Sequence, residues 1–222
     1  APPLRMSHLI TGLLFIPILG ALCAIVAPRC YGRVVALGST LITALLALSL
    51  WQHYDPAAGG MQLMERHAWI PSIGAEYLLG LDGLSLLLVL LTSLIFPFAL
   101  LAQRMDRGFC ALLLVMQAAL YGPFTAQHFL LWFLFYEMSL VPAFLVVKIG
   151  CGEKRELGAT KFFLYSFLGS VAMLLSFLGI YLVRGTFDFA ELARLGPGGL
   201  VPGKVGWLIF AGIFLGLAIK VP

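Results

Sequence analysis

The sequence predicts an all-α integral membrane protein, a polytopic bundle of about seven transmembrane helices. Of its 222 residues, 61% are apolar and only 11% are charged, whereas soluble proteins average ~25% charged residues. A hydrocarbon core of ~30 Å needs ~20 mostly apolar residues in one helix. Stretches of about this length occupy residues 8–27, 34–51, 82–101, 109–124, 127–147 and 160–183, and a last one begins near Lys204.

The ends of the predicted spans carry residues that are typical of a membrane boundary. Trp51 and Tyr54 follow the second apolar stretch, and amphipathic aromatic side chains gather at the membrane interface. Asp82 and Ser85 open the third stretch, where the free N–H groups of a helix N-terminus prefer short polar acceptors. We therefore interpret Asp82 and Ser85 as capping residues.

Two polar segments separate spans within what we otherwise treat as a single transmembrane domain over residues 1–222. Residues 53–81 and residues 184–203 are rich in polar residues, glycine and proline, which predicts two extracytoplasmic loops. In the first of them, short apolar runs at 68–70 and 77–79 flank Pro71 and Gly74. This pattern predicts a short β-hairpin that lies on the membrane surface.

Lysine and arginine residues predict the orientation of the chain, because cytoplasmic loops carry an excess of them. Connections after the first, third and fifth spans carry eight, which are Arg29, Arg33, Arg104, Arg107, Lys148, Lys154, Arg155 and Lys161. The other side carries five, which are Arg5, Arg66, Arg184, Arg194 and Lys204. The first group should be cytoplasmic, so we expect the N-terminus to lie outside the cytoplasm of a bacterial inner (cytoplasmic) membrane.

No sequence motif predicts a cofactor, a metal ion or a nucleic acid as a ligand of this chain. The four cysteines, Cys23, Cys30, Cys110 and Cys151, have no metal-ligand spacing. Glycine-rich phosphate loops and nucleophile elbows are missing from the sequence. The net charge of +4 comes from loop residues that orient the chain, without a basic patch for nucleic acid.

Glu137 is an ionisable residue in the middle of the fifth predicted span. A charge at that depth costs at least ~2.5 kcal/mol, so such residues face a partner or a wet cavity and are usually functional. A protonated Glu137 that only hydrogen-bonds a neighbouring helix is the alternative. We favour a functional Glu137.

Lys220 lies at the end of the last apolar stretch, two residues before Pro222. A proline removes a backbone donor and tends to break a transmembrane helix, which would leave a buried lysine beside free backbone groups. The alternative is a lysine that reaches the membrane surface at the end of a span. The residues alone leave both readings open.

His128 precedes Glu137 by nine residues, or ~13 Å along a helix. Because histidine titrates near neutral pH, a role in proton exit is one reading. Side chains of this amphipathic kind also gather at the interface without such a role. We favour the interfacial reading for His128.

Four motifs occur in order along the chain, LDGLS at 81–85, YEMSLVP at 136–142, ATKFFLY at 159–165 and AIKVP at 218–222. Together they resemble the M subunit of bacterial respiratory complex I, the family of mitochondrial NADH dehydrogenase subunit 4. Leu81 to Ser85 (LDGLS), after Trp69-Ile70-Pro71, resembles the entry to its third helix. Residues 136–142 (YEMSLVP) resemble its Trp-Glu-x-x-Leu-x-Pro signature, 159–165 (ATKFFLY) its sixth helix, and 218–222 (AIKVP) its broken seventh helix. Tyr136 stands where the family has Trp.

The resemblance implies an antiporter-like subunit of roughly fourteen helices in two inverted repeats, of which this chain would be an N-terminal fragment with the first repeat. It also implies proton translocation through Glu137 and Lys220, with Lys161 as an accessory residue. Protons would move as quinone is reduced elsewhere in the complex. The chain would carry no redox centre, and partner subunits would hold FMN and iron–sulfur clusters. Other membrane-arm subunits, among them neighbouring antiporter-like ones, and lipids would be its partners.

Two other functions remain open at this point. The same superfamily contains sodium/proton antiporters and membrane-bound hydrogenases, and short motifs do not separate them. A structural membrane subunit, in which the polar groups only join helices, is an alternative of another class. A membrane enzyme with its own catalytic site is the least favoured, since no nucleophile–base constellation is visible.

We expect Glu137 and Lys220 to act as a pair, because opposite charges tolerate the bilayer interior best together. Lys220 lies sixteen residues after Lys204, which is ~24 Å along a helix. That distance alone places Lys220 deeper toward the cytoplasm than Glu137. A direct contact therefore requires the seventh helix to tilt or to start lower.

The orientation is testable by labelling single cysteines with a membrane-impermeant reagent. A cysteine near Glu65 should react from outside the cytoplasm, and one near Lys154 only from the cytoplasmic side, because of the lysine and arginine distribution. Intact cells and inverted vesicles present the two sides separately. Labelling with the opposite sidedness would contradict the predicted orientation.

Overall fold

Seven helices among the described residues are long and apolar enough to cross a membrane, as the sequence predicts. The computed structural model describes residues 8–28, 30–102, 106–149, 155–195, 201 and 203–220. The spans are α1 Leu9–Val26, α2 Gly32–His53, α3 Gly83–Ala102, α4 Arg107–Thr125, Phe129–Ile149, α7 Arg155–Arg184 and α9 Gly203–Lys220. The expected break at Pro222 and the predicted labelling position near Lys154 lie outside the described residues.

The chain divides into two compact units. The first comprises Ala1–His67 and Tyr77–Ala126, and the second comprises Ala68–Glu76 and Gln127–Pro222. That both belong to one transmembrane domain, and that 53–81 and 184–203 lie outside the cytoplasm, stay predictions.

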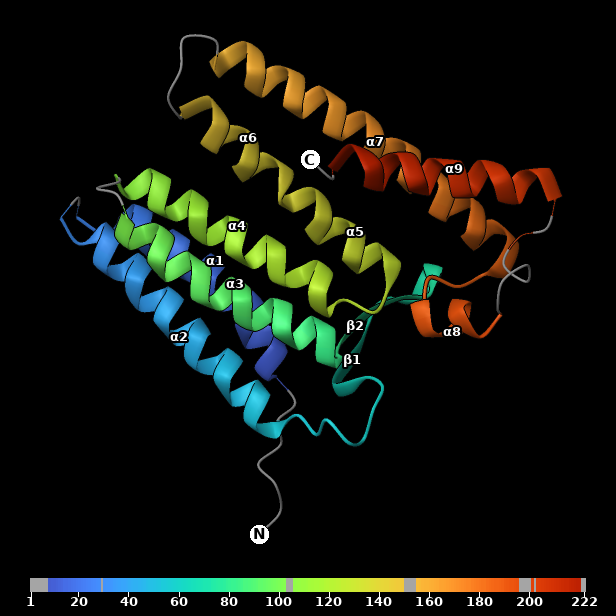
Figure 1. The fold of residues 1–222 in the computed structure, drawn as a ribbon, viewed down its shortest axis with the longest axis horizontal. Helices are drawn as coiled ribbons and strands as arrows, with labels where there is room; N and C mark the ends of the chain where they lie inside the picture. The colour runs from blue at the N-terminus through green and yellow to red at the C-terminus, as the bar shows by residue number, and fades with distance from the viewer. Residues whose placement is uncertain are drawn as a thin grey trace. The chain divides into compact units, whose positions relative to one another are not determined.

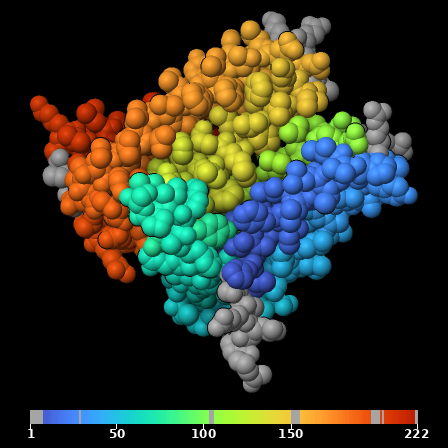
Figure 2. Space-filling model, turned by 180° about the vertical axis from the view of Figure 1, so that it is seen from behind, coloured from blue at the N-terminus to red at the C-terminus, as the bar shows by residue number. Residues whose placement is uncertain are grey.

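The first unit is a bundle of α1 to α4 (Figure 1). Helix α1 packs against α2 and α4, and α3 packs against both of these as well. Small side chains such as Ala21 and Ala36 join Leu100 and Leu114 in one buried cluster. The outer face of α1, blue in Figure 2, exposes apolar side chains, among them Leu19 and Leu22. An apolar exterior around a core of small residues is what a bilayer requires.

A buried hydrogen-bond network joins three helices of the first unit near their middles. The Gln117 side-chain amide donates to Thr43 Oγ1 at 3.1 Å and to Tyr121 O–H at 2.8 Å. Tyr121 and Ser93 share a further hydrogen bond of 2.7 Å. These residues come from α2, α3 and α4 and carry no charge, so neutral buried groups join the three helices.

The predicted hairpin forms, with longer strands than the apolar runs at 68–70 and 77–79, and its place on the membrane surface stays a prediction. Strand β1 Gln62–Ile70 pairs with β2 Ala75–Leu81, and the turn between them ends at Gly74, whose φ of 65° suits glycine. The hairpin base also holds the N-terminus of α1. Glu65 is buried, and its carboxylate accepts from Ile10 N at 2.8 Å and from the Thr11 hydroxyl. A labelling cysteine therefore belongs at the neighbouring Met64, which is 53% exposed.

The structure agrees with one local prediction, the cap at Asp82, and differs from another, the loop at 184–203. Asp82 Oδ1 accepts from Ser85 N at 2.7 Å, which confirms the capping interpretation of Asp82 and lowers the pKa of its carboxyl. Residues 184–203, expected to be a loop, contain the short helix α8 Phe189–Arg194, capped by Asp188. Six residues are too few for a helical hydrophobic period to be visible in the sequence.

The second unit contains α5 Phe129–Met138, α6 Leu140–Ile149, α7, α8 and α9 (Figure 1). Helix α7 packs against α6 and closely against α9. Gly169 lies at the α7–α9 contact, where a Cβ added to the glycine would come 3.0 Å from Ile219 Cδ1 and 3.4 Å from the Cα of Gly216. Small residues here allow close approach of the backbones.

We expect Gly216→Ala to weaken the packing of α9 against α7. A Cβ there would lie 2.6 Å from Met173 Cβ and 2.8 Å from the Gly169 carbonyl oxygen, and neither atom is the end of a flexible side chain. Overpacking of this kind costs ~1–3 kcal/mol. The matched control is Gly158→Ala on α7, because no atom lies within 4 Å of a Cβ at that position.

Thermal unfolding of the detergent-solubilised protein measures the difference. The melting temperature should fall for Gly216→Ala and not for Gly158→Ala. Equal melting temperatures for the two variants would show that α9 packs less closely than the glycine contacts indicate.

Candidate functional site

The fifth span is interrupted beside Glu137. Helix α5 ends at Met138, and α6 begins at Leu140. Pro142 has no N–H group, so the Met138 carbonyl lacks its usual donor four residues further on. The Ser139 hydroxyl donates to the Tyr136 carbonyl at 2.7 Å. The interruption therefore leaves backbone acceptors available in the middle of a membrane span.

Lys220 occupies this interruption. Its Nζ donates to the Tyr136 carbonyl oxygen at 2.8 Å and to Ser139 Oγ at 3.3 Å. The same ammonium nitrogen lies 3.4 Å from the centre of the Tyr136 ring, a cation–π arrangement. Lys220 is half-buried and all of these partners are neutral.

Tyr136 contacts α9 at a second point. Its hydroxyl donates to the Gly216 carbonyl at 3.1 Å, one helical turn before Lys220. On its other face, the Tyr136 ring stacks with Trp132 at 4.8 Å between centroids. These two contacts hold the Tyr136 ring, and with it the Tyr136 carbonyl, in a fixed position relative to the end of α9. Sequence reasoning did not single out Tyr136 or Ser139 as functional, because their partner is more than eighty residues away.

Glu137 lies beside this arrangement without joining it. Its Oε1 atom is buried and has no hydrogen-bond partner among the described residues. Within the same residues no hydrogen bond or ion pair connects Glu137 directly to Lys220, although the two are close enough to interact electrostatically. The bond to Tyr136, the residue before Glu137, places Lys220 level with Glu137. Helix length places Lys220 deeper than Glu137 only where the helices stand upright in the membrane.

Lys161 is not part of the arrangement. It lies on the exposed surface near the start of α7. In the described part of the chain, no hydrogen bond or ion pair joins it to Glu137 or to Lys220.

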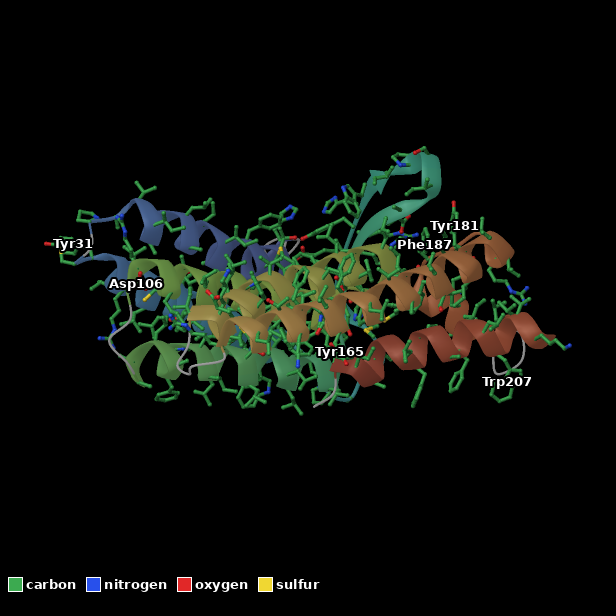
Figure 3. All side chains as sticks on the ribbon, turned by 90° about the horizontal axis from the view of Figure 1, so that it is seen from above. Tyr31, Asp106, Tyr165, Tyr181, Phe187 and Trp207 are labelled. Atoms are coloured by element: carbon green, nitrogen blue, oxygen red, sulfur yellow. The ribbon has the colours of Figure 1, made fainter. Side chains whose placement is uncertain are left out.

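His128 lies just before α5, buried beneath the hairpin tip. It is 1% exposed, and its Nε2 lies 3.3 Å from the Gly74 carbonyl oxygen. Its Nδ1 has no partner among the described residues. The ring packs edge-on against Phe187, which stacks with Tyr181 (labelled in Figure 3). His128 is thus buried in a layer of aromatic side chains, and its position at the membrane interface stays a prediction.

Backbone hydrogen bonds close this layer around His128. Phe129 N donates to the Phe187 carbonyl at 2.8 Å, and Phe189 N donates to the Gln127 carbonyl at 3.1 Å. Burial lowers the pKa of His128 below its ordinary value of 6.5, although the Gly74 carbonyl, Glu76 and Asp188 act in the opposite direction. Burial therefore favours the neutral form of the imidazole.

No cluster of three or more His, Cys, Asp or Glu residues that would suit a metal ion occurs in the described part of the chain. What the fold and the site define is a polytopic helical membrane protein with a carboxylate and a lysine beside a broken span.

Known proteins identify the family. Residues 126–222 match the family model described as "NADH:quinone oxidoreductase/Mrp antiporter, TM". The chain is 37% identical to the NADH-quinone oxidoreductase subunit M of Rhodobacter capsulatus over 98% of its own length. It also resembles a chain of respiratory complex I from Thermus thermophilus, with 27% identity and a TM-score of 0.85 over 96% of its length. Residues 126–222 therefore carry the transmembrane domain of this family, and nearly the whole chain is similar to the antiporter-like subunits.

The match covers part of each relative. The chain spans 46% of the Rhodobacter subunit and 44% of the Thermus chain. A chain of the Mrp complex from a Dietzia species shares the fold, with a TM-score of 0.79 at 18% identity over 98% of this chain and 24% of that one.

We expect the layer around His128 to open more readily at acidic pH. An imidazole with a lowered pKa in the folded state binds fewer protons than in the open state as pH falls below 6.5, so protonation favours opening. Amide exchange of Phe129 and Phe189, corrected for intrinsic rates, should lose protection from pH ~7.5 to pH ~5.5. The variant His128→Gln keeps a donor for Gly74 and should flatten this dependence. An unchanged pH dependence in His128→Gln would show that a group other than His128 causes it.

Proposed function

We propose that this chain is a proton-translocating membrane subunit of NADH-quinone oxidoreductase, and that Glu137 and Lys220 carry the proton step. One observation supports this most directly. Lys220 Nζ lies on the Tyr136 carbonyl at 2.8 Å, one residue from a Glu137 carboxylate whose Oε1 is buried without a partner among the described residues. Two costly ionisable groups are thus close together inside the membrane and are not neutralised by a direct bond.

The chemistry follows from this separation. When the Glu137 carboxylate approaches Lys220, the ion pair stabilises the ammonium form. When the pair opens, the ammonium keeps only neutral partners and releases a proton more readily. A change in charge elsewhere in the assembly that opens and closes the pair would move a proton on and off Lys220. Quinone reduction in other subunits would supply that change.

The assembly and the location are part of the same proposal. Partner subunits would be other membrane-arm subunits, including neighbouring antiporter-like ones, and they would hold FMN and iron–sulfur clusters. The membrane would be the bacterial inner membrane. Lys161 and His128 are at most accessory, because Lys161 is exposed and His128 is buried in a structural layer.

Sodium/proton antiport is the second candidate, and the shared fold of the Dietzia Mrp chain favours considering it. A structural subunit is the third. In that case Glu137 and Lys220 would only join helices, and an uncharged side chain able to form hydrogen bonds would replace Glu137 without loss.

We expect Glu137→Gln and Lys220→Ala to lower NADH-driven proton pumping by ~10-fold or more. A tenfold decrease corresponds to an activation free energy that is higher by ~1.4 kcal/mol in the rate-limiting step. Fluorescence quenching in inverted membrane vesicles measures the pumping, and NADH–ferricyanide activity reports assembly. Matched controls are Glu156→Gln and Lys204→Ala, whose side chains are exposed at helix ends.

Pumping near normal in Glu137→Gln would favour the structural role. Pumping that requires sodium ions and survives without quinone reduction would favour the antiporter. Loss of assembly in both variants would mean that the pair is needed for folding, and Glu137→Asp would then test whether the carboxylate itself is required for pumping.

A further inference from the structure

The resting position of Lys220 is built from neutral groups. The Tyr136 carbonyl accepts from Nζ at 2.8 Å, Ser139 Oγ accepts at 3.3 Å, and the Tyr136 ring lies under the same nitrogen at 3.4 Å. We call these three groups the lysine socket. They come from α5 and the break that follows it, whereas Lys220 comes from α9.

Each member of the lysine socket suits a cation for its own physical reason. The Tyr136 carbonyl belongs to the last turn of α5, where the helix dipole carries partial negative charge. The face of an aromatic ring attracts cations. Ser139 uses its only hydroxyl proton on the Tyr136 carbonyl, so its lone pairs are turned toward Lys220.

Tyr136 is held in place from both sides. Its hydroxyl bonds to the Gly216 carbonyl at 3.1 Å, and its ring stacks on Trp132. The ring therefore cannot turn away when the lysine leaves, and the lysine socket stays formed. The indole of Trp, the residue that stands in the family signature, also has a ring face and one N–H donor. Trp can replace both functions of Tyr136.

We propose that Tyr136 and Ser139 are positioning residues that hold Lys220 while its ion pair with Glu137 is open. This inference rests on the proposed function. Lys220 has two alternative positions, the lysine socket and the carboxylate of Glu137. The two positions belong to neighbouring residues of one helix end, and the long, flexible lysine side chain would move between them. The lysine socket makes the open state a defined position and not a charge left without partners.

The test uses Tyr136→Leu and Ser139→Ala in the assembled complex in inverted vesicles. We expect each to lower NADH-driven pumping several-fold with normal NADH–ferricyanide activity, and Tyr136→Trp and Ser139→Thr to restore it. Tyr165→Leu, an exposed tyrosine on α7 (Figure 3), is the matched control for side-chain size. In a Glu137→Gln background, loss of the lysine socket should have no further effect, because no pair remains to open.

A second measurement does not depend on pumping. Amine-reactive acetic anhydride modifies neutral lysine side chains, and mass spectrometry gives the extent at Lys220. Loss of the lysine socket should raise modification of Lys220 several-fold and leave that of Lys204 unchanged. Ser139→Ala removes only one small group, so this readout survives if Tyr136→Leu fails to assemble.

The outcomes separate the two proposals. Normal pumping and unchanged modification in Tyr136→Leu and Ser139→Ala, with pumping lost in Glu137→Gln, would overturn the lysine socket and leave the proposed function standing. Normal pumping in Glu137→Gln and Lys220→Ala would overturn the proposed function. Failure of Tyr136→Trp or Ser139→Thr to restore pumping would show that the residues matter for packing and not for holding the lysine.

Discussion

The structure depends on one constraint, that polar groups inside a bilayer need hydrogen-bond partners, and the hydrogen bond from Lys220 to the Tyr136 carbonyl satisfies it. Inside a bilayer, a polar group without a partner costs several kcal/mol. The break between α5 and α6 frees backbone acceptors, and the ammonium of α9 supplies donors to them. Each of the two offsets the free-energy cost of the other, because a helix break without donors and a buried lysine without acceptors are both unfavourable. Together they place an ionisable group inside the second unit.

The two units satisfy the same constraint in different ways. In the first unit, Gln117, Tyr121 and Ser93 form a neutral network near the middle of the helices. The Glu65 carboxylate there accepts a hydrogen bond from the backbone of α1. Each of those side chains already has a hydrogen-bond partner. In the second, Glu137 keeps an acceptor atom without a partner among the described residues, and Lys220 rests on neutral groups. The proton step that we propose for Glu137 and Lys220 needs groups that can change partners, and the second arrangement provides such groups.

Composition predicts the spans because the bilayer sets their length and polarity, and turn residues such as Gly74 predict the hairpin. Caps such as Asp82 are also predictable, because the carboxylate and its partner Ser85 N lie only three residues apart. The break after Met138 is different, because proline is a poor signal for it: Pro17, Pro97 and Pro123 lie inside helices that continue past them. The partners of Glu65 and Lys220 are more than fifty residues away, so no local pattern contains them. Glu137 and Lys220 themselves were visible because charges are rare in spans.

An unpartnered buried acceptor costs ~1–3 kcal/mol. In the proposed mechanism this cost decides how the free energies of the two positions of Lys220 compare. If the lysine bonded only to Glu137, the ion pair would be the single stable state. The neutral groups at Tyr136 and Ser139 offset part of what is lost when the pair opens, so the two states differ by less. States separated by a few kcal/mol are both populated to a useful extent. A small change in nearby charge then suffices to exchange them, which is the property a coupled ion-transfer site requires.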